Sequence, residues 1–159
     1  SKLPAGPGCG PGKGAAPEEL VRAGRMVRRA GMFCSVTVLL GIAGTRYSRD
    51  HALATAAVLN RMQPHQIAVL TLMLLDNTPL GEERRAGRFV LPDREGLFLE
   101  LRALLQHLEL DRVQFHANHA SNYFALEGRL PRDRSRMLAA VDRVLAGEAA
   151  LRPESHRAL

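Results

Sequence analysis

Residues 36–40 read Val-Thr-Val-Leu-Leu, and residues 67–75 read Ile-Ala-Val-Leu-Thr-Leu-Met-Leu-Leu. Each run is apolar at nearly every position and ends in a polar or glycine-containing turn, at residues 41–45 and 76–79. Strands of this kind are typical of parallel sheets whose two faces are both covered by helices. The two runs therefore predict an α/β fold in which ligands bind at the carboxyl ends of the strands.

The other elements follow from helical periodicity and from helix start and stop residues. Ser48 is suited to cap the helix between the two strands, and a leucine stripe over residues 97–108 marks the clearest helix. The strand–helix–strand order implies a right-handed parallel crossover. The predicted helices are 17–30, 48–62, 81–88, 93–108 and 131–146, and the predicted strands are 33–40, 66–75 and 113–116.

These elements divide the chain into three parts. Residues 1–16 are rich in glycine and proline and predict an irregular leader. Residues 17–147 form the α/β domain, and residues 148–159 are expected to fray as a carboxyl-terminal tail.

Composition limits the class of protein. A chain of 159 residues is long enough to bury a core. Cys9 and Cys34 are its two cysteines, which fits the reducing cytoplasm better than a disulfide framework. Neither apolar run reaches the roughly 18 residues that a membrane span requires, and no signal peptide opens the chain, so we expect a cytoplasmic protein without a membrane partner. The net charge of +6 admits RNA as a partner, although solvated helix surfaces explain dispersed arginines equally well.

Two strand ends carry candidate ligand contacts. The glycines of Gly41-Ile42-Ala43-Gly44 would let the backbone approach a flat ligand closely. The segment is neither a dinucleotide fingerprint nor a phosphate loop, because G-x-G-x-x-G and Gly-Lys-Ser/Thr are both missing. Asp76 follows the second strand, where it could bind a ribose hydroxyl or an amine. A plain turn accounts for each segment as well.

The densest polar cluster follows the third strand. His116 and His119 suggest a metal pair, but no third ligand lies at a familiar spacing, so we expect no metal site. Ser121 beside His119 suggests a nucleophile, but no G-x-S-x-G elbow is present, and no catalytic residue is identified. The remaining interpretations are a loop closed by its own side-chain hydrogen bonds and a substrate-contacting loop. In the second case the contacts come from Asn118, His119, Ser121, Asn122 and Tyr123.

Taken in order, several short segments resemble the carboxyl-terminal half of a radical S-adenosylmethionine (radical SAM) protein. The likeness is sharpest at residues 35–44, Ser-Val-Thr-Val-Leu-Leu-Gly-Ile-Ala-Gly, and it covers nearly all of residues 13–146. It includes the segments 13–19, 23–24, 30–31, 51–52, 71–74 and 78–80, Ser48, and the closing stretch 118–123 with Gly128 and residues 130–131.

The resemblance implies a partial (β/α) barrel, namely the carboxyl-terminal half of a (β/α)6 barrel followed by extra helices. It implies two cofactors, S-adenosylmethionine and an iron–sulfur cluster ([4Fe-4S]), which together generate a 5′-deoxyadenosyl radical. The two apolar strands correspond to the fifth and sixth strands of the family. Gly41, Ile42 and Gly44, with Leu74 and Leu75, then inherit contacts to the adenine.

The chain departs from the family pattern in three places. The cluster motif Cys-x3-Cys-x2-Cys is missing from the sequence, and residues 3–10 stand where the fourth strand should end in Glu-Ser-Gly. Ala43 and Thr45 replace the expected Gly and acid. We therefore expect a fragment of an enzyme that is inactive alone and whose partner is the missing amino-terminal half-barrel. Its substrate is a small molecule or an RNA. The alternatives are a non-catalytic half-barrel that acts as an interaction partner and a basic RNA-binding module.

Overall fold

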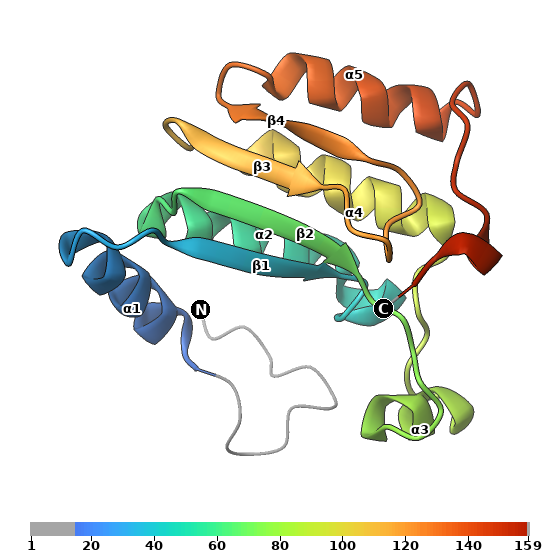
Figure 1. The fold of residues 1–159 in the computed structure, drawn as a ribbon. Coiled ribbons are helices and arrows are strands. Elements are labelled where there is room, and N and C mark those ends of the chain that lie inside the picture. The colour runs from blue at the N-terminus through green and yellow to red at the C-terminus, as the bar shows by residue number, and fades with distance from the viewer. Residues whose placement is uncertain (1–14, 159) are drawn as a thin grey trace.

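The computed structural model describes residues 15–158, which form an open four-stranded α/β sheet with its helices (Figure 1). The predicted leader therefore lies almost entirely outside the described residues. Within them, no helix has both the length and the apolar character needed to cross a membrane. In chain order the elements are α1 (Pro17–Arg29), β1 (Ser35–Leu40), α2 (Gly44–Met62), β2 (Gln66–Thr71), α3 (Pro79–Arg85), α4 (Arg94–His107), β3 (Val113–Ala117), β4 (Leu126–Leu130), α5 (Arg134–Leu145) and the short 3-10 helix η1 (Glu154–His156).

The strands lie in chain order, β1-β2-β3-β4. β1 pairs with β2 in parallel, from Ser35 opposite Gln66 to Leu40 opposite Thr71, and β2 pairs with β3 in parallel. These pairings confirm the predicted parallel core. β4 runs antiparallel to β3, so the chain returns along β4 toward the end of the sheet at which the three parallel strands begin.

The helices pack on one face of this sheet, which corrects the expectation that both faces would be covered. In Figure 1, α2 and α4 lie behind the strands, while α5 contacts α4 and β4 and α1 contacts α2. Burial alternates along the strands because successive side chains point to opposite faces. Val38, Ile67 and Phe115 are fully buried toward the helices, whereas Leu39 and Leu70 on the other face are only half-buried.

α4 is the central helix of the core. The predicted leucine stripe is confirmed, since all its members are at most 5% exposed: Leu97, Leu101, Leu104, Leu105 and Leu108. Asp93 begins the helix by accepting the Gly96 N–H at 2.8 Å. The helix contacts α2, α5 and β1, so it joins both halves of the fold.

Several predicted boundaries were wrong. α2 begins at Gly44 instead of Ser48, and β2 ends at Thr71 instead of Leu75. β2 ends early because β1, its neighbour, ends at Leu40, whose carbonyl accepts the last bond, from the Leu72 N–H at 3.0 Å. β4 was missed altogether, because Leu126-Glu127-Gly128-Arg129-Leu130 is short, has charges on its open face, and has a glycine between its two leucines on the side that faces α5.

The basic residues of α1 serve the packing of α1 on α2. Arg25 Nε donates to the Arg61 carbonyl at 2.9 Å, and Arg28 donates to the Gln63 carbonyl. Arg61 pairs in turn with Glu18 at 2.5 Å. The guanidinium groups of Arg25 and Arg28 are therefore used inside the fold, whereas the sequence alone allowed them to bind an acidic partner.

Candidate functional site

The carboxyl ends of the three parallel strands lie at the same end of the sheet, which we call the rim. Three segments leave the strands there: the turn 41–43 after β1, the residues from Leu72 onward after β2, and residues 118–124 after β3, which we call the rim loop. Every residue proposed from the sequence as a cofactor or substrate contact lies in one of these segments or at the start of α2. The parallel pairing thus places all candidates downstream of the same edge.

The glycines after β1 are used in packing. Gly41 and Gly44 both have positive φ, +85° and +66°. A Cβ on Gly41 would lie 3.0 Å from Leu97 and 3.2 Å from Leu91, and one on Gly44 would lie 3.1 Å from the Val90 carbonyl. The chain itself therefore fills the space beside both glycines. Ile42 stays 39% exposed at the tip of the turn.

A buried carboxylate, Glu100 of α4, anchors this turn. Its side chain is completely buried, and its oxygens accept the Gly41 N–H at 3.2 and 3.3 Å. The Ser48 hydroxyl donates to Oε2 at 2.6 Å, and His51 Nδ1 lies 3.0 Å from Oε1. An ionised carboxylate only accepts, so the contact with His51 is a hydrogen bond in the tautomer that carries its proton on Nδ1. Glu100 thus joins the end of β1 to α2 and α4.

This cluster does not have the connectivity of a nucleophilic triad, in which an imidazole lies between the hydroxyl and the carboxylate. Here the hydroxyl and the imidazole both donate to the same carboxylate, so the arrangement holds elements together. Glu100 was not among the residues predicted from the sequence. Its position, three residues after Leu97 and four before Leu104, places a carboxylate on the apolar stripe and could have revealed it.

The segment after β2 leads away from the sheet. Leu74 is half-buried, Leu75 is 45% exposed, and Asp76 is exposed and paired with Arg84 at 2.6 Å. Thr78 then caps α3 by accepting the Gly81 N–H at 3.1 Å. The contacts of Asp76 are those of a turn that leads into a helix.

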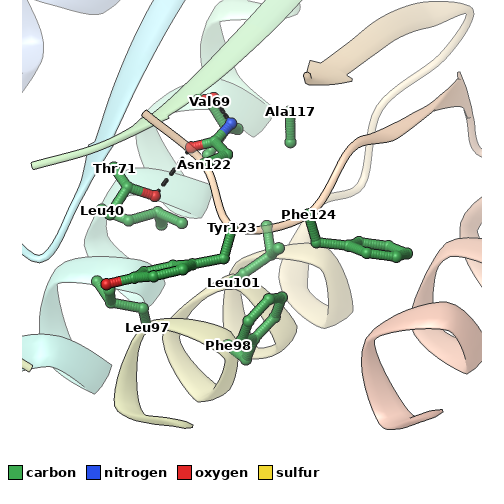
Figure 2. Close-up of a pocket in the computed structure, with 10 residues that line it drawn as sticks. All are labelled: Leu40, Val69, Thr71, Leu97, Phe98, Leu101, Ala117, Asn122, Tyr123 and Phe124. Carbon is green, nitrogen blue, oxygen red and sulfur yellow. Dashed lines mark hydrogen bonds between the residues drawn. The ribbon is translucent and has the colours of Figure 1, made fainter. Parts of the chain in front are cut away.

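The rim loop binds to the end of β2 through two buried polar side chains. Asn122 accepts the Thr71 hydroxyl at 2.8 Å and donates to the Val69 carbonyl at 2.7 Å (Figure 2). Ser121 Oγ accepts the Thr71 N–H at 3.2 Å. His119 Nδ1 accepts the Ser121 N–H at 3.1 Å and lies 3.0 Å from its hydroxyl. These bonds support the interpretation of a loop closed by its own side chains.

A small void lies beneath the rim loop. It has a volume of about 20 Å³, which is close to the space of one water molecule. The closing residues are Asn122, Tyr123 and Phe124 of the rim loop, and the rest come from the strand ends and α4 (Figure 2). The void, which we call the rim void, is lined by Leu40, Val69, Thr71, Leu97, Phe98, Leu101, Ala117, Asn122, Tyr123 and Phe124.

Asn118, which is exposed, and Tyr123, which is half-buried, have partners as well. Asn118 hydrogen-bonds to Glu127 of β4. The Tyr123 hydroxyl donates to Glu154, and burial together with this bond raises the pKa of Tyr123. Glu154 belongs to residues 148–158, which we call the C-terminal strap. The strap, for which the sequence predicts fraying, lies against the rim loop in the structure, where the Arg152 N–H donates to the Tyr123 carbonyl at 2.7 Å.

The described residues do not fit an iron–sulfur cluster. Within residues 15–158, no group of three or more His, Cys, Asp or Glu side chains is arranged to hold a metal ion. Cys34 is buried just before β1, at the edge of the sheet opposite the rim. Such clusters are held by several thiolates. Cys9 lies outside the described residues.

No protein-family model, curated protein or solved structure matches this chain.

Proposed function

We propose that this chain is one wall of a radical SAM type partial (β/α) barrel and that its rim contributes to binding S-adenosylmethionine. The observation that carries the proposal is the one-sided sheet. Three consecutive parallel strands have their helices on one face, and the other face is left open. A barrel wall has this construction, since its helices form the outer layer and its other face looks inward.

The open face has a composition suited to an interior wall. On its β1–β2 half, the face is apolar toward the rim, at Leu39, Ala68 and Leu70, and polar at the far end, where Gln66 hydrogen-bonds to Ser35. Gln114 and His116 of β3 add further polar groups. β1 lies at an edge of the sheet, where a further parallel strand could pair. Together these features support a chain that forms its site jointly with another part of the complete protein, which would also hold the cluster.

The test uses the complete translation product of the reading frame that encodes this chain, purified without oxygen and supplied with S-adenosylmethionine and a reductant. We expect 5′-deoxyadenosine to form. Ile42→Lys at the exposed tip of the β1 turn should raise the KM for S-adenosylmethionine. The matched control, Met32→Lys, changes a 60% exposed residue at the opposite edge and should leave that KM unchanged. Failure to form any 5′-deoxyadenosine would contradict the proposal.

A second candidate is a non-catalytic half-barrel that binds a partner through the same open face. The half-exposed Leu39 and Leu70, which lie opposite each other in the β1–β2 register, favour an interaction surface. A complete product that binds a partner through this face yet forms no 5′-deoxyadenosine would identify this function.

A further inference from the structure

The C-terminal strap holds the rim loop by its backbone carbonyls. Arg152 Nη1 donates to the carbonyls of Ala120 at 2.9 Å, Asn122 at 3.1 Å and His119 at 3.3 Å. Arg157 Nε donates to the Ser121 carbonyl at 2.6 Å. Two arginine side chains thus bind four consecutive carbonyls of the loop.

Arg157 makes close contacts with the rim loop, but one of its buried nitrogens has no hydrogen-bond partner among the described residues. The Arg157 side chain is 3% exposed, its Cζ lies 4.1 Å from the centre of the Tyr123 ring, and its Nη1 donates to the Tyr123 hydroxyl at 2.8 Å. Its Nη2 is also buried but has no hydrogen-bond partner among the described residues. A buried donor without a partner costs free energy, so the closed strap is less stable than its other contacts alone would make it.

The remainder of the strap is weakly attached. Residues 153–156 are exposed, and within the strap Ala149 and Leu151 add apolar contacts with the core. The strap leaves α5 at Gly147, whose φ is +75°. Segments with few buried apolar contacts open at a lower free energy than the core. The strap can therefore detach while the packing around α4 stays intact.

We propose that the C-terminal strap gates the rim void: when Arg152 and Arg157 release the rim loop, Asn122, Tyr123 and Phe124 move away and the void accepts a small, flat, mainly apolar molecule. These three residues of the rim loop line the void together with Leu40, Leu97 and Leu101 (Figure 2). The closed void, at about 20 Å³, is too small for such a ligand. Opening is therefore required for binding.

A polar group at the void favours apolar ligands that carry one hydrogen-bonding group. The Thr71 hydroxyl donates to Asn122 in the closed state, and it loses this partner but stays at the void when the loop moves. A ring that carries one N–H or carbonyl can replace it. Opening requires that the strap arginines release the loop and that the bonds of Ser121 and Asn122 to β2 break, so the gate does not depend on whether the rim binds S-adenosylmethionine.

Hydrogen exchange of the full chain tests the gate. In the double variant Arg152→Gln/Arg157→Gln, the amides of Thr71 and Asn122 should exchange at least about tenfold faster, because opening no longer breaks the charged bonds. The amides of Leu104 and Leu105 in α4 should be unchanged. The matched control is Arg143→Gln, at an exposed arginine of α5. Unchanged exchange at Thr71 and Asn122, or equal acceleration in α4, would overturn the gate.

Indole tests the ligand. The chain contains no Trp, so the fluorescence of added indole reports its binding directly. The double variant should bind indole at least about tenfold more tightly than the wild type, because more of it is in the open state. The charge-preserving pair Arg152→Lys/Arg157→Lys lacks the forked donors and should lie between the two. Equal affinity for the wild type and the double variant would overturn the proposal.

Discussion

At the scale of single residues, Glu100 anchors the β1 turn to α2 and α4. A fully buried carboxylate is stable here because it accepts bonds from a backbone N–H, a hydroxyl and an imidazole. The hydrogen bonds of Glu100 thus offset the cost of burying a charge, and they connect the end of β1 to α2 and α4.

Glu100→Gln should therefore destabilise the chain by about 1–3 kcal/mol, because the new amide NH2 must face one of the three donors. Urea unfolding of the purified chain measures the change. The matched control is Glu95→Gln, at an exposed position on the same helix. A loss no larger than that of the control would show that the carboxylate is not the joint we describe.

A comparison of Gly41 with Gly87 distinguishes the cost of a packing clash from the cost of backbone strain. Both have positive φ, +85° and +71°, but a Cβ at Gly87 would meet no atom within 4 Å, whereas one at Gly41 would meet Leu97 and Leu91. Gly41→Ala should lower the free energy of unfolding more than Gly87→Ala, by about 1–3 kcal/mol. Equal losses in thermal or urea unfolding would mean that the β1 turn has room beside its glycine.

Asp133 gives the chain a specific response to acid. The Arg132 guanidinium and the Arg129 N–H hold the pKa of its carboxyl well below the usual value. Since the folded-state pKa is lowered, the ionised carboxylate stabilises the fold at neutral pH, and this contribution is lost as the pH falls below about 4. Asp133→Asn should therefore be less stable than the wild type at neutral pH, with a difference that shrinks in acid. A constant difference at all pH values, or one matched by the exposed-site control Asp50→Asn, would contradict this assignment.

At the scale of elements, α4 carries most of the packing, since it contacts both α2 and α5. Leu104 is 1% exposed and Leu99, on the same helix, is 51% exposed. Leu104→Ala should cost about 2–5 kcal/mol, while Leu99→Ala should cost far less. Similar losses in urea unfolding would mean that the helix is not buried on the leucine stripe.

The same helix shows what periodicity can and cannot predict. The leucine stripe over 97–108 gave the buried face of α4 correctly, because a period of 3.6 residues fixes which side chains share a face. Residues 72–75 were assigned to β2 because they are apolar, but a strand continues only while a neighbour pairs with it. β4 was missed because its partner, β3, decides its pairing and its own five residues carry little pattern.

The candidate site was predictable in part. Residues 41–44, Asp76 and residues 118–123 were singled out because each follows a predicted strand, while Leu74 and Leu75 came from the family resemblance alone. The parallel pairing places all three strand ends at one end of the sheet. The joint made by Glu100 and the bonds from Arg152 and Arg157 were not predicted. Each links residues far apart in the chain, and such contacts leave no local spacing in the sequence.

At the scale of the whole molecule, two surfaces are available for association: the open face of the sheet and the unpaired edge of β1. Unpaired strand edges and exposed apolar faces favour association. We expect the isolated chain to associate reversibly in the micromolar range in sedimentation measurements. Leu70→Gln on the open face should weaken this association, whereas Leu99→Gln on the helical side should not. A strictly monomeric wild-type chain would contradict an open surface that needs a partner.

We propose that this chain contributes its rim to a binding site for S-adenosylmethionine, and hydrogen exchange of the complete translation product with and without that ligand is the direct test. We expect the ligand to protect amides at residues 41–45, 72–76 and 118–123 while leaving those at 31–34 and 63–65 unchanged. Protection confined to residues 31–34 and 63–65, at the opposite edge, would contradict the claim, and so would a complete product in which the ligand protects none of these segments.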